Sequence, residues 1–266
     1  MKEPVRILSD LHLGHKVSRI ERVSALRPLI AGAGTVVFNG DTWQEMAPPF
    51  RERSAAMLEE LKALCAEERV DAVFLAGNHD PGWSGPGWLE LAGGRIVVTH
   101  GDALLRSGSP WKREILAAAG RVEELWAEHP AAGTDLAQRL QLAKAIARDL
   151  CSVEYPFGRS FFQRAWDAAV PPRRALCMLE SWFTQAAAGA GFCDRYFPAA
   201  EVLVIGHFHW QGSWVKGGRR VINTGSFCDP GRAQWVEWRE GWLMRGEIDE
   251  SPETCRIGRT LEVWRF

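Results

Sequence analysis

Five short polar motifs, each following a short apolar run, constrain this chain more than any other feature of its sequence. Apolar runs rich in β-branched residues and ended by polar clusters predict β-strands. In an open α/β sheet, the loops at the carboxyl ends of the strands form the crevice in which ligands bind. We therefore expect side chains from five strand ends to converge on one place. In chain order the motifs are Asp10-Leu11-His12, Gly40-Asp41, Gly77-Asn78-His79-Asp80, His100-Gly101-Asp102 and Gly206-His207-Phe208-His209.

The predicted strands alternate with helices in the first part of the chain. Residues 51–68 form the clearest helix, because their apolar side chains lie near one face and their charges opposite. This alternation favours an α/β (α+β layered) domain with largely parallel strands. Three runs near the end of the chain predict a second, mostly antiparallel sheet. The predicted strands are residues 5–8, 35–38, 72–75, 95–99, 202–205 and 219–223, followed by 234–239, 242–246 and 260–266.

The segment between the fourth and fifth motifs is predicted to be helical. Ser109-Pro110 is typical of a helix N-cap followed by proline at the first helical position. Apolar residues then recur at helical spacing over residues 111–128, 134–151 and 173–188. We expect one domain over residues 1–266, with residues 103–200 as a helical insertion, or cap, within it. Insertions of this kind often carry substrate-specific features.

The composition is that of an ordinary globular chain, with 46% hydrophobic and 24% charged residues among 266. A formal net charge of −1 shows no excess of basic residues of the kind that binds a nucleic-acid backbone, although a local basic patch stays open.

The N-terminal apolar run is too short for a secretory signal, and no other run approaches a membrane span. The six cysteines form no CxxC pair and are interpreted as reduced thiols. We expect a cytoplasmic protein, with peripheral association at the inner membrane left open.

The motif side chains share one kind of chemistry. Aspartate and asparagine oxygens and neutral imidazole nitrogens are the ligands expected for Mn, Fe, Zn or similar divalent ions, and no cysteine among them suggests structural zinc. In an extended chain, side chains two residues apart lie on the same side, which pairs Asp10 with His12 and His207 with His209. A lone histidine at a strand end is more often a hydrogen-bonded core residue. Five of the seven histidines lie in the motifs, however, and together they favour a metal site.

The ordered set of motifs resembles the calcineurin-like metallophosphoesterase superfamily, whose pattern is D-x-H, G-D, G-N-H-D/E, H and G-H-x-H. The matching parts are residues 5–102 and 202–228. The resemblance implies a double β-sheet sandwich flanked by helices. It also implies two divalent metal ions, manganese first, with iron, zinc or nickel as alternatives. One ion would be held by Asp10, His12, Asp41 and His209, and the other by Asp41, Asn78, His100 and His207.

The same resemblance implies roles for two further residues. His79 matches the histidine that stabilises the transition state or protonates the leaving oxygen, and Asp80 matches the acidic residue that orients it. Two cations lower the pKa of a shared water, and the metal-bridging hydroxide would attack phosphorus in line. The sequence therefore predicts a hydrolase that cleaves a phosphodiester or a phosphoanhydride.

The substrate is less constrained than the chemistry. No arginine follows the Gly-Asp motif before Arg51, which disfavours a protein Ser/Thr phosphatase. The helical insertion and the opening run Ser9 to Gly14 resemble the UDP-2,3-diacylglucosamine pyrophosphatases of lipid A synthesis. Their insertion caps the acyl chains, and their products are UMP and a lipid monophosphate. Several of those enzymes carry arginine where this chain has His79, which leaves the assignment open.

Two other classes of function stay open. A phosphodiesterase or nuclease of the same superfamily would act on nucleotides or nucleic acid. A non-catalytic binding module is disfavoured, because all seven ligand positions carry competent side chains. The expected partner is a phosphorylated small molecule or a nucleotide-lipid, and the oligomeric state is not addressed by the sequence.

Aromatic and basic residues add candidate substrate contacts. Three tryptophans lie close to motif residues in the sequence, namely Trp43, Trp83 and Trp210. Their rings are able to stack on a base or sugar of the substrate. The alternative interpretation is that they pack at the rim of the site. Several basic residues of the insertion are candidates to bind a second phosphate, with solvated surface charge as the alternative. These are Arg106, Lys112, Arg113, Arg159, Arg164, Arg173 and Arg174.

Overall fold

A computed structural model describes residues 1–150, 172–251 and 253–266. One of its two sheets has six strands in the order β11-β10-β9-β1-β2-β3. β1 (Val5–Leu8), β2 (Thr35–Asn39) and β3 (Asp71–Leu75) are parallel neighbours. On its other side β1 pairs antiparallel with β9 (Gln234–Arg239), which leads to β10 (Trp242–Glu250) and β11 (Cys255–Arg265).

The second sheet has five strands in the order β4-β5-β6-β8-β7. β5 (Ile96–Thr99), β6 (Val202–Ile205) and β8 (Arg219–Asn223) are parallel, and the edge strands β4 (Trp88–Leu91) and β7 (Gly212–Lys216) pair antiparallel with them. The two sheets face one another, because one apolar cluster takes side chains from both. Its fully buried members include Ile7, Val37, Val98, Val204 and Ile222.

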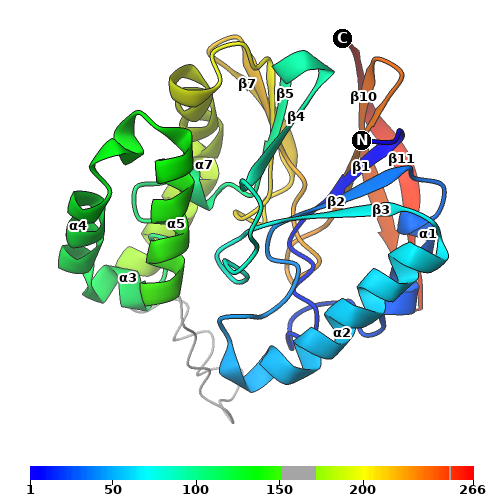
Figure 1. The fold of residues 1–266 in the computed structure, drawn as a ribbon, viewed down its shortest axis with the longest axis horizontal. Coiled ribbons are helices and arrows are strands. Elements are labelled where there is room, and N and C mark those ends of the chain that lie inside the picture. Colours follow the sequence, from blue (N-terminus) through cyan, green and yellow to red (C-terminus); the bar gives the residue numbers. More distant parts are fainter. Residues whose placement is uncertain (151–171, 252) are drawn as a thin grey trace.

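Helices cover both outer faces of this sandwich (Figure 1). On the six-stranded side, α1 (Arg27–Ile30) and α2 (Pro48–Glu67) pack their apolar residues against Leu8 and Phe38. On the five-stranded side, α7 (Pro172–Tyr196) packs Phe192 and Cys193 against Leu203 and Val221. The result is a layered α/β/β/α arrangement.

A group of three further helices lies beside α7, on the side of the molecule away from the six-stranded sheet (Figure 1). They are α3 (Arg113–Ala117), α4 (Ala119–Glu128) and α5 (Leu136–Leu150), which share an apolar cluster of their own. Short 3-10 helices complete the described elements; they are η1 (Val23–Leu26), η2 (Ala92–Gly94), η3 (Asp102–Leu104) and η4 (Pro130–Gly133). In the described residues, no helix has the length and apolar character needed to cross a membrane.

The predicted fold class is confirmed, whereas the predicted division of strands between the sheets is wrong. The last three strands form no sheet of their own; β9 pairs with β1, so they extend the sheet that also contains β2 and β3. β5, β6 and β8 instead form the core of the second sheet. Local patterns predict strands but not their neighbours, because Ile7 and Val236, which pair here, are far apart in the chain.

Helix boundaries differ from the predictions at several ends. The helix predicted over residues 111–128 is interrupted at Ala118, whose φ of −114° and ψ of 40° separate α3 from α4. The helix that was predicted from residue 51 begins at Pro48, because proline is suited to the first helical turn. Cys151, the predicted end of a helix, lies outside the described residues. The division into a domain and a cap of residues 103–200 stays a prediction.

Candidate metal centre

The five motifs all lie where β1, β2, β3, β5 and β6 end, at one edge of the sandwich. Hydrogen bonds between the loops join them to one another. The backbone N–H of His12 donates to Asp41 O at 2.9 Å, and that of Gly206 donates to His100 O at 2.8 Å. The two sheets are connected through Asp10, whose carboxylate Oδ2 accepts the His207 backbone N–H at 3.0 Å. The expected convergence of motif residues is thus present, with both sheets contributing.

The backbone is strained at these loops. Left-handed φ angles are unfavourable for residues with a Cβ and are concentrated at functional sites. Among the described residues, eight non-glycine residues have positive φ, and five of them are predicted metal ligands. They are Asp10 (53°), His12 (48°), Asp41 (49°), His207 (66°) and His209 (54°). Each such residue costs about 1–3 kcal/mol, so the surrounding fold stabilises a geometry that these residues would not adopt alone.

The motif positions require glycine for two different structural reasons, a left-handed backbone or a lack of room for a Cβ atom. Gly40 has a φ of +80°, as expected for a sharp turn at a strand end. Gly77 and Gly206 are not in that region, and their role is to leave room. A Cβ at Gly77 would overlap the Asp41 carboxylate, and one at Gly206 would overlap that of Asp10. Of these three glycines, Gly40 alone has the left-handed backbone of a sharp turn.

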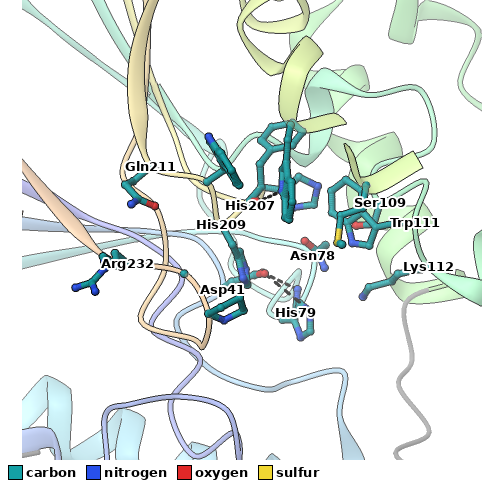
Figure 2. A pocket seen from close by; sticks show the side chains of 16 residues that line it. Asp41, Asn78, His79, Ser109, Trp111, Lys112, His207, His209, Gln211 and Arg232 are labelled. Atoms are coloured by element: carbon teal, nitrogen blue, oxygen red, sulfur yellow. Dashed lines mark hydrogen bonds and ion pairs between the residues drawn. The ribbon is translucent and has the colours of Figure 1, made fainter. Parts of the chain in front are cut away.

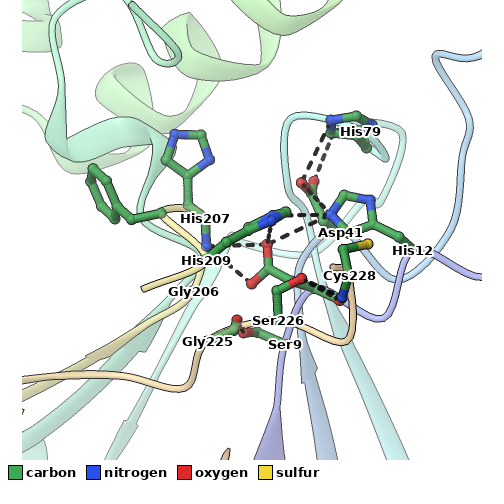
Figure 3. Close-up of polar contacts among 12 residues, drawn as sticks. Ser9, His12, Asp41, His79, Gly206, His207, His209, Gly225, Ser226 and Cys228 are labelled. Atoms are coloured by element: carbon green, nitrogen blue, oxygen red, sulfur yellow. Dashed lines mark hydrogen bonds and ion pairs between the residues drawn. The ribbon is translucent and has the colours of Figure 1, made fainter. Parts of the chain in front are cut away.

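Four of the predicted ligands form a compact group. The potential ligand atoms of Asp10, His12, Asp41 and His209 all lie within 4.8 Å of one another. His209 Nε2 is 3.2 Å from Asp10 Oδ1 and also 3.2 Å from His12 Nε2. Figure 3 shows His12, His79 and His209 gathered around Asp41. Imidazole nitrogens and carboxylate oxygens that point at a common centre are a suitable donor set for a divalent cation.

Of the other predicted ligands, His100 lies near the second carboxylate oxygen of Asp41. His100 Nε2 is 3.5 Å from Asp41 Oδ1, and the rings of His100 and His207 are 5.1 Å apart. His100 Nδ1 donates to Asn39 O at 2.9 Å, and His207 Nε2 donates to Gly108 O at 3.1 Å. Each ring thus places one nitrogen proton on a backbone carbonyl, which leaves its other nitrogen to face a cation.

Two atoms in this second group have no hydrogen-bond partner. Asn78 Oδ1 and His100 Nε2 are both buried and unpartnered within the described part of the chain. Buried polar atoms without a hydrogen bond are rare, and each calls for an ion or water. Their donor chemistry suits a second cation, whereas the compact ligand group found among the described residues contains Asp10, His12, Asp41 and His209.

The charge states suit cation binding. Burial disfavours the charged form of Asp41, but the nearby His100 and His79 outweigh it and hold the pKa of its carboxyl well below the usual range. Burial and the nearby His100 lower the pKa of His207 to about 3, so its ring is neutral at pH 7. Burial also lowers the pKa of His12. Burial disfavours the charged form of His100, but the nearby Asp41 outweighs it and holds the pKa of this ring well above its usual value, so a cation that binds here displaces its proton. The ionised Asp41 and the neutral His12 and His207 already have the protonation state that metal ligation requires.

His79 lies at the edge of this group. Its backbone N–H donates to Asp41 Oδ1 at 2.7 Å, and its Nε2 lies 4.0 Å from Asp41 Oδ2. Its Nδ1 is 3.0 Å from Oε1 of Gln44, whose other amide atom is 2.7 Å from His12 Nδ1. Sequence reasoning missed Gln44. Its only signal was its position three residues after Asp41, in the same loop.

Asp80 does not orient the His79 ring as the resemblance implied. Its Oδ1 accepts the backbone N–H groups of Asp41 and Gly77, both at 2.9 Å, and its Oδ2 accepts that of Thr42 at 2.8 Å. The contact with the His79 ring is made by Gln44 instead. Burial and the nearby Asp41 raise the pKa of Asp80 to about 7. Asp80 therefore positions the loop that carries Asp41.

A cavity of about 510 Å³ opens over the group (Figure 2). Asp41, Asn78, His79, His207 and His209 line one part of it. Its apolar lining comes mainly from Trp111, Met178, Trp182, Phe208 and Trp210.

The three tryptophans singled out from the sequence differ in their placement. Trp210 lines the cavity and is 46% exposed, with its ring 4.7 Å from that of Trp182. Trp83 stacks on Phe74 at 4.6 Å and lines a separate hollow together with Trp43. Of the three, Trp210 is therefore placed to contact a ligand in the cavity, and Trp43 and Trp83 pack elsewhere.

A family model described as calcineurin-like phosphoesterase matches residues 3–147, more than half of the chain. The chain belongs to the calcineurin-like phosphoesterase family. It is accordingly a metal-dependent hydrolase, and the group of Asp10, His12, Asp41 and His209 is a candidate metal site of this family. Among curated proteins, none matches the sequence significantly.

Solved structures of the same general fold are distant. Vacuolar protein sorting 29 from Cryptosporidium parvum is 14% identical over 98% of this chain and 97% of its own, with a TM-score of 0.41. A predicted phosphoesterase from Streptococcus pneumoniae is 14% identical over 100% and 99%, with a TM-score of 0.39. A dimetal phosphatase from Danio rerio is 13% identical over 97% and 98%, with a TM-score of 0.47. At these scores the likeness adds nothing to the assignment.

Proposed function

We propose that this calcineurin-like phosphoesterase hydrolyses a phosphodiester or phosphoanhydride with two divalent ions bound on either side of Asp41. The observation that supports this most is the position of the Asp41 carboxylate. Its Oδ2 lies 3.7 Å from His12 Nε2, and its Oδ1 lies 3.5 Å from His100 Nε2. One carboxylate thus faces both groups of ligands, as a bridging ligand would. Asp10, His12 and His209 would complete one site, and Asn78, His100 and His207 the other.

The residues around the ions would bind and orient the substrate. Bound ions supply a nucleophilic water at neutral pH and neutralise charge on the phosphoryl oxygens. His79 lines the cavity beside Asn78, so it can reach a leaving oxygen of a phosphoryl group bound there. Burial lowers the pKa of His79, so its neutral ring would stabilise the leaving oxygen by donating a hydrogen bond.

Gln44 connects the protonation states of His12 and His79. Metal ligation by His12 Nε2 requires the proton of its ring on Nδ1, which then donates to the Gln44 amide oxygen. The Gln44 amide nitrogen then donates to His79 Nδ1, which leaves the proton of His79 on Nε2, 4.0 Å from Asp41. The two ends of a glutamine amide are interchangeable by rotation, so the contacts are compatible with this assignment. We propose Gln44 as a positioning residue for His79.

For the substrate, our first candidate is UDP-2,3-diacylglucosamine, cleaved to UMP and a lipid phosphate. The apolar wall of the cavity, with Met178, Trp182 and Trp210, supports a substrate that has an apolar part. We propose manganese as the metal, residues 103–200 as the cap, and the cytoplasm as the compartment, with peripheral association at the inner membrane. Cell fractionation would test the last two together.

The experiment combines metal analysis with product identification. The purified protein is loaded with Mn²⁺, Fe²⁺, Zn²⁺ or Ni²⁺, and the bound metal is counted by mass spectrometry. The loaded protein is then offered UDP-2,3-diacylglucosamine, UDP-glucose, cyclic AMP and single-stranded DNA. We expect two ions per chain and UMP from the acylated substrate. Cleavage of DNA alone would favour a nuclease, and failure to bind any of the four metals would contradict the proposed function.

A further inference from the structure

Two polar groups on the cavity wall have no partner in the described residues. Ser109 is 1% exposed, and its Oγ makes no hydrogen bond. Lys112 is partly buried, and its Nζ is inaccessible and likewise without a hydrogen-bond partner. Both residues line the cavity. Burial of an unpaired ammonium is unfavourable, so these two groups call for an anionic ligand.

The other basic candidates of the region differ from Lys112. Arg106 pairs with Glu123, and Arg174 donates to Trp111 O at 3.0 Å. Arg159 and Arg164 lie outside the described residues. Of the five basic candidates that lie in the described residues, Lys112 is the one that lines the cavity.

The segment that carries Ser109 and Lys112 is joined to the candidate metal centre. Gly108 O accepts the hydrogen bond from His207 Nε2 at 3.1 Å, and the Lys112 N–H donates to Ser109 O at 2.9 Å. Figure 2 shows Lys112 extending from the helical side of the cavity toward His79, with Arg232 on the opposite side. The Lys112 ammonium is therefore on the His79 side, where the leaving group of a bound phosphoryl compound would lie.

We propose that Ser109 and Lys112 form a subsite for a second phosphate of the substrate, carried by the leaving group. The substrate class is then a phosphoanhydride, and both products are phosphate monoesters or their derivatives. This inference rests on the proposed function. An alcohol leaving group would carry no anionic oxygen for Lys112, whereas a phosphate leaving group has several.

The reaction balances with the groups present. A water oxygen forms a bond to the scissile phosphorus, and the bond from that phosphorus to the bridging oxygen breaks. The electron pair of the broken bond leaves with the second phosphate. His79 donates a hydrogen bond from Nε2 to the bridging oxygen, which departs on the anionic phosphate, and the proton lost by the water passes to solvent. Lys112 Nζ and Ser109 Oγ donate hydrogen bonds to the oxygens of the departing phosphate.

The first test measures binding without turnover. α,β-Methylene-ADP cannot be cleaved between its phosphates and carries two of them, whereas AMP carries one. Calorimetry on the Mn²⁺-loaded protein should show that Lys112→Met weakens binding of the analogue about 10- to 100-fold, as expected for a lost charge-assisted hydrogen bond. AMP binding should change less than about threefold. Equal losses for both ligands, or none for the analogue, would overturn the subsite.

The second test measures rates with two substrates. UDP-glucose is a phosphoanhydride, and bis(p-nitrophenyl) phosphate is a diester without a second phosphate. Lys112→Met should lower kcat/KM for UDP-glucose about 10- to 100-fold and leave the diester within about threefold. Lys112→Arg should retain part of the UDP-glucose rate, and Ser109→Ala should give a smaller loss of about 3- to 10-fold. Lys216→Met, at an exposed position on β7, is the matched control and should change neither rate.

The outcomes separate this inference from the proposed function. If the wild-type protein binds two metals and cleaves the diester, but Lys112→Met affects both substrates equally, the subsite is wrong and the proposed function stands. If the wild-type protein binds no metal and cleaves neither substrate, the proposed function itself fails.

Discussion

Two groups of buried polar residues in this molecule differ in whether their polar atoms have hydrogen-bond partners. On the outer face of β1, Arg6 and Glu237 are both buried, and Arg6 also donates to Leu29 O at 2.7 Å and Ala31 O at 3.3 Å. Arg6 Nε donates to Glu237 Oε2 at 3.0 Å. At the candidate metal centre, by contrast, Asn78 Oδ1 and His100 Nε2 have no hydrogen-bond partner in the described chain. We infer that the paired group stabilises the fold and that the unpaired group binds a ligand.

The comparison predicts that the two groups respond oppositely to mutation. Loss of a residue from the paired group should reduce stability and leave chemistry unchanged. Loss of a residue from the metal centre should abolish chemistry with little loss of stability, because that group gains its partners only when ligands bind.

The largest effect is expected for Asp41→Ala. Asp41 faces both ligand groups, so its removal should lower the metal content from two ions and reduce kcat at least about 1,000-fold, since several kcal/mol of charge stabilisation are lost. Metal analysis and diester hydrolysis measure this. Asp71→Ala, at an exposed ion pair with Lys2, is the control and should change neither quantity. A variant that keeps both ions and full activity would remove Asp41 from the centre.

His79→Ala should keep both metals and lose rate. The ring lines the cavity without belonging to either ligand group, so metal analysis should match the wild type while kcat falls about 10²–10⁴-fold. The loss should be smaller for p-nitrophenyl esters, whose leaving group needs little stabilisation by a hydrogen bond. Full activity of the variant toward an unactivated substrate would show that the assigned role is wrong.

The paired group is tested by Glu237→Leu. This change leaves the buried Arg6 guanidinium without its carboxylate and should lower the free energy of unfolding by about 3–5 kcal/mol. Denaturant unfolding measures the loss, and the activity of the folded fraction should be unchanged. Arg6→Met combined with Glu237→Leu removes both charges and should recover most of the stability. A double variant as unstable as the single one would show that packing, not charge, decides this position.

Gln44→Leu is expected to have the smallest effect. Loss of its contacts with His12 and His79 leaves two rings without their orienting partner, and changes of this kind typically cost about 10- to 100-fold in activity or metal affinity. The pH profile of kcat should shift as well, because the protonation of His79 is no longer tied to Gln44. A loss of stability with an unchanged pH profile would instead indicate a purely structural role.

Much of the site was predictable from the sequence because its signals are local. A candidate ligand such as His12 or His209 is identified by its own residue type and by its place after an apolar strand. Five strand ends carry such residues, and the alternation of apolar runs and helical segments was enough to predict layers of sheet and helix. These properties depend on a few consecutive residues, so they can be recognised without knowledge of the rest of the fold.

The remaining features depend on residues that are distant in the chain. The placement of β9 beside β1, the contact of Gln44 with His79, and the backbone contacts of Asp80 all arise from packing. The room needed at Gly206 depends on Asp10, which belongs to the other sheet. The sequence by itself therefore determined which chemical groups this protein has and near which strand ends they lie. The tertiary structure decided which of those groups are satisfied by one another and which are left for a ligand, because hydrogen bonding and burial are set by all the neighbours of an atom at once.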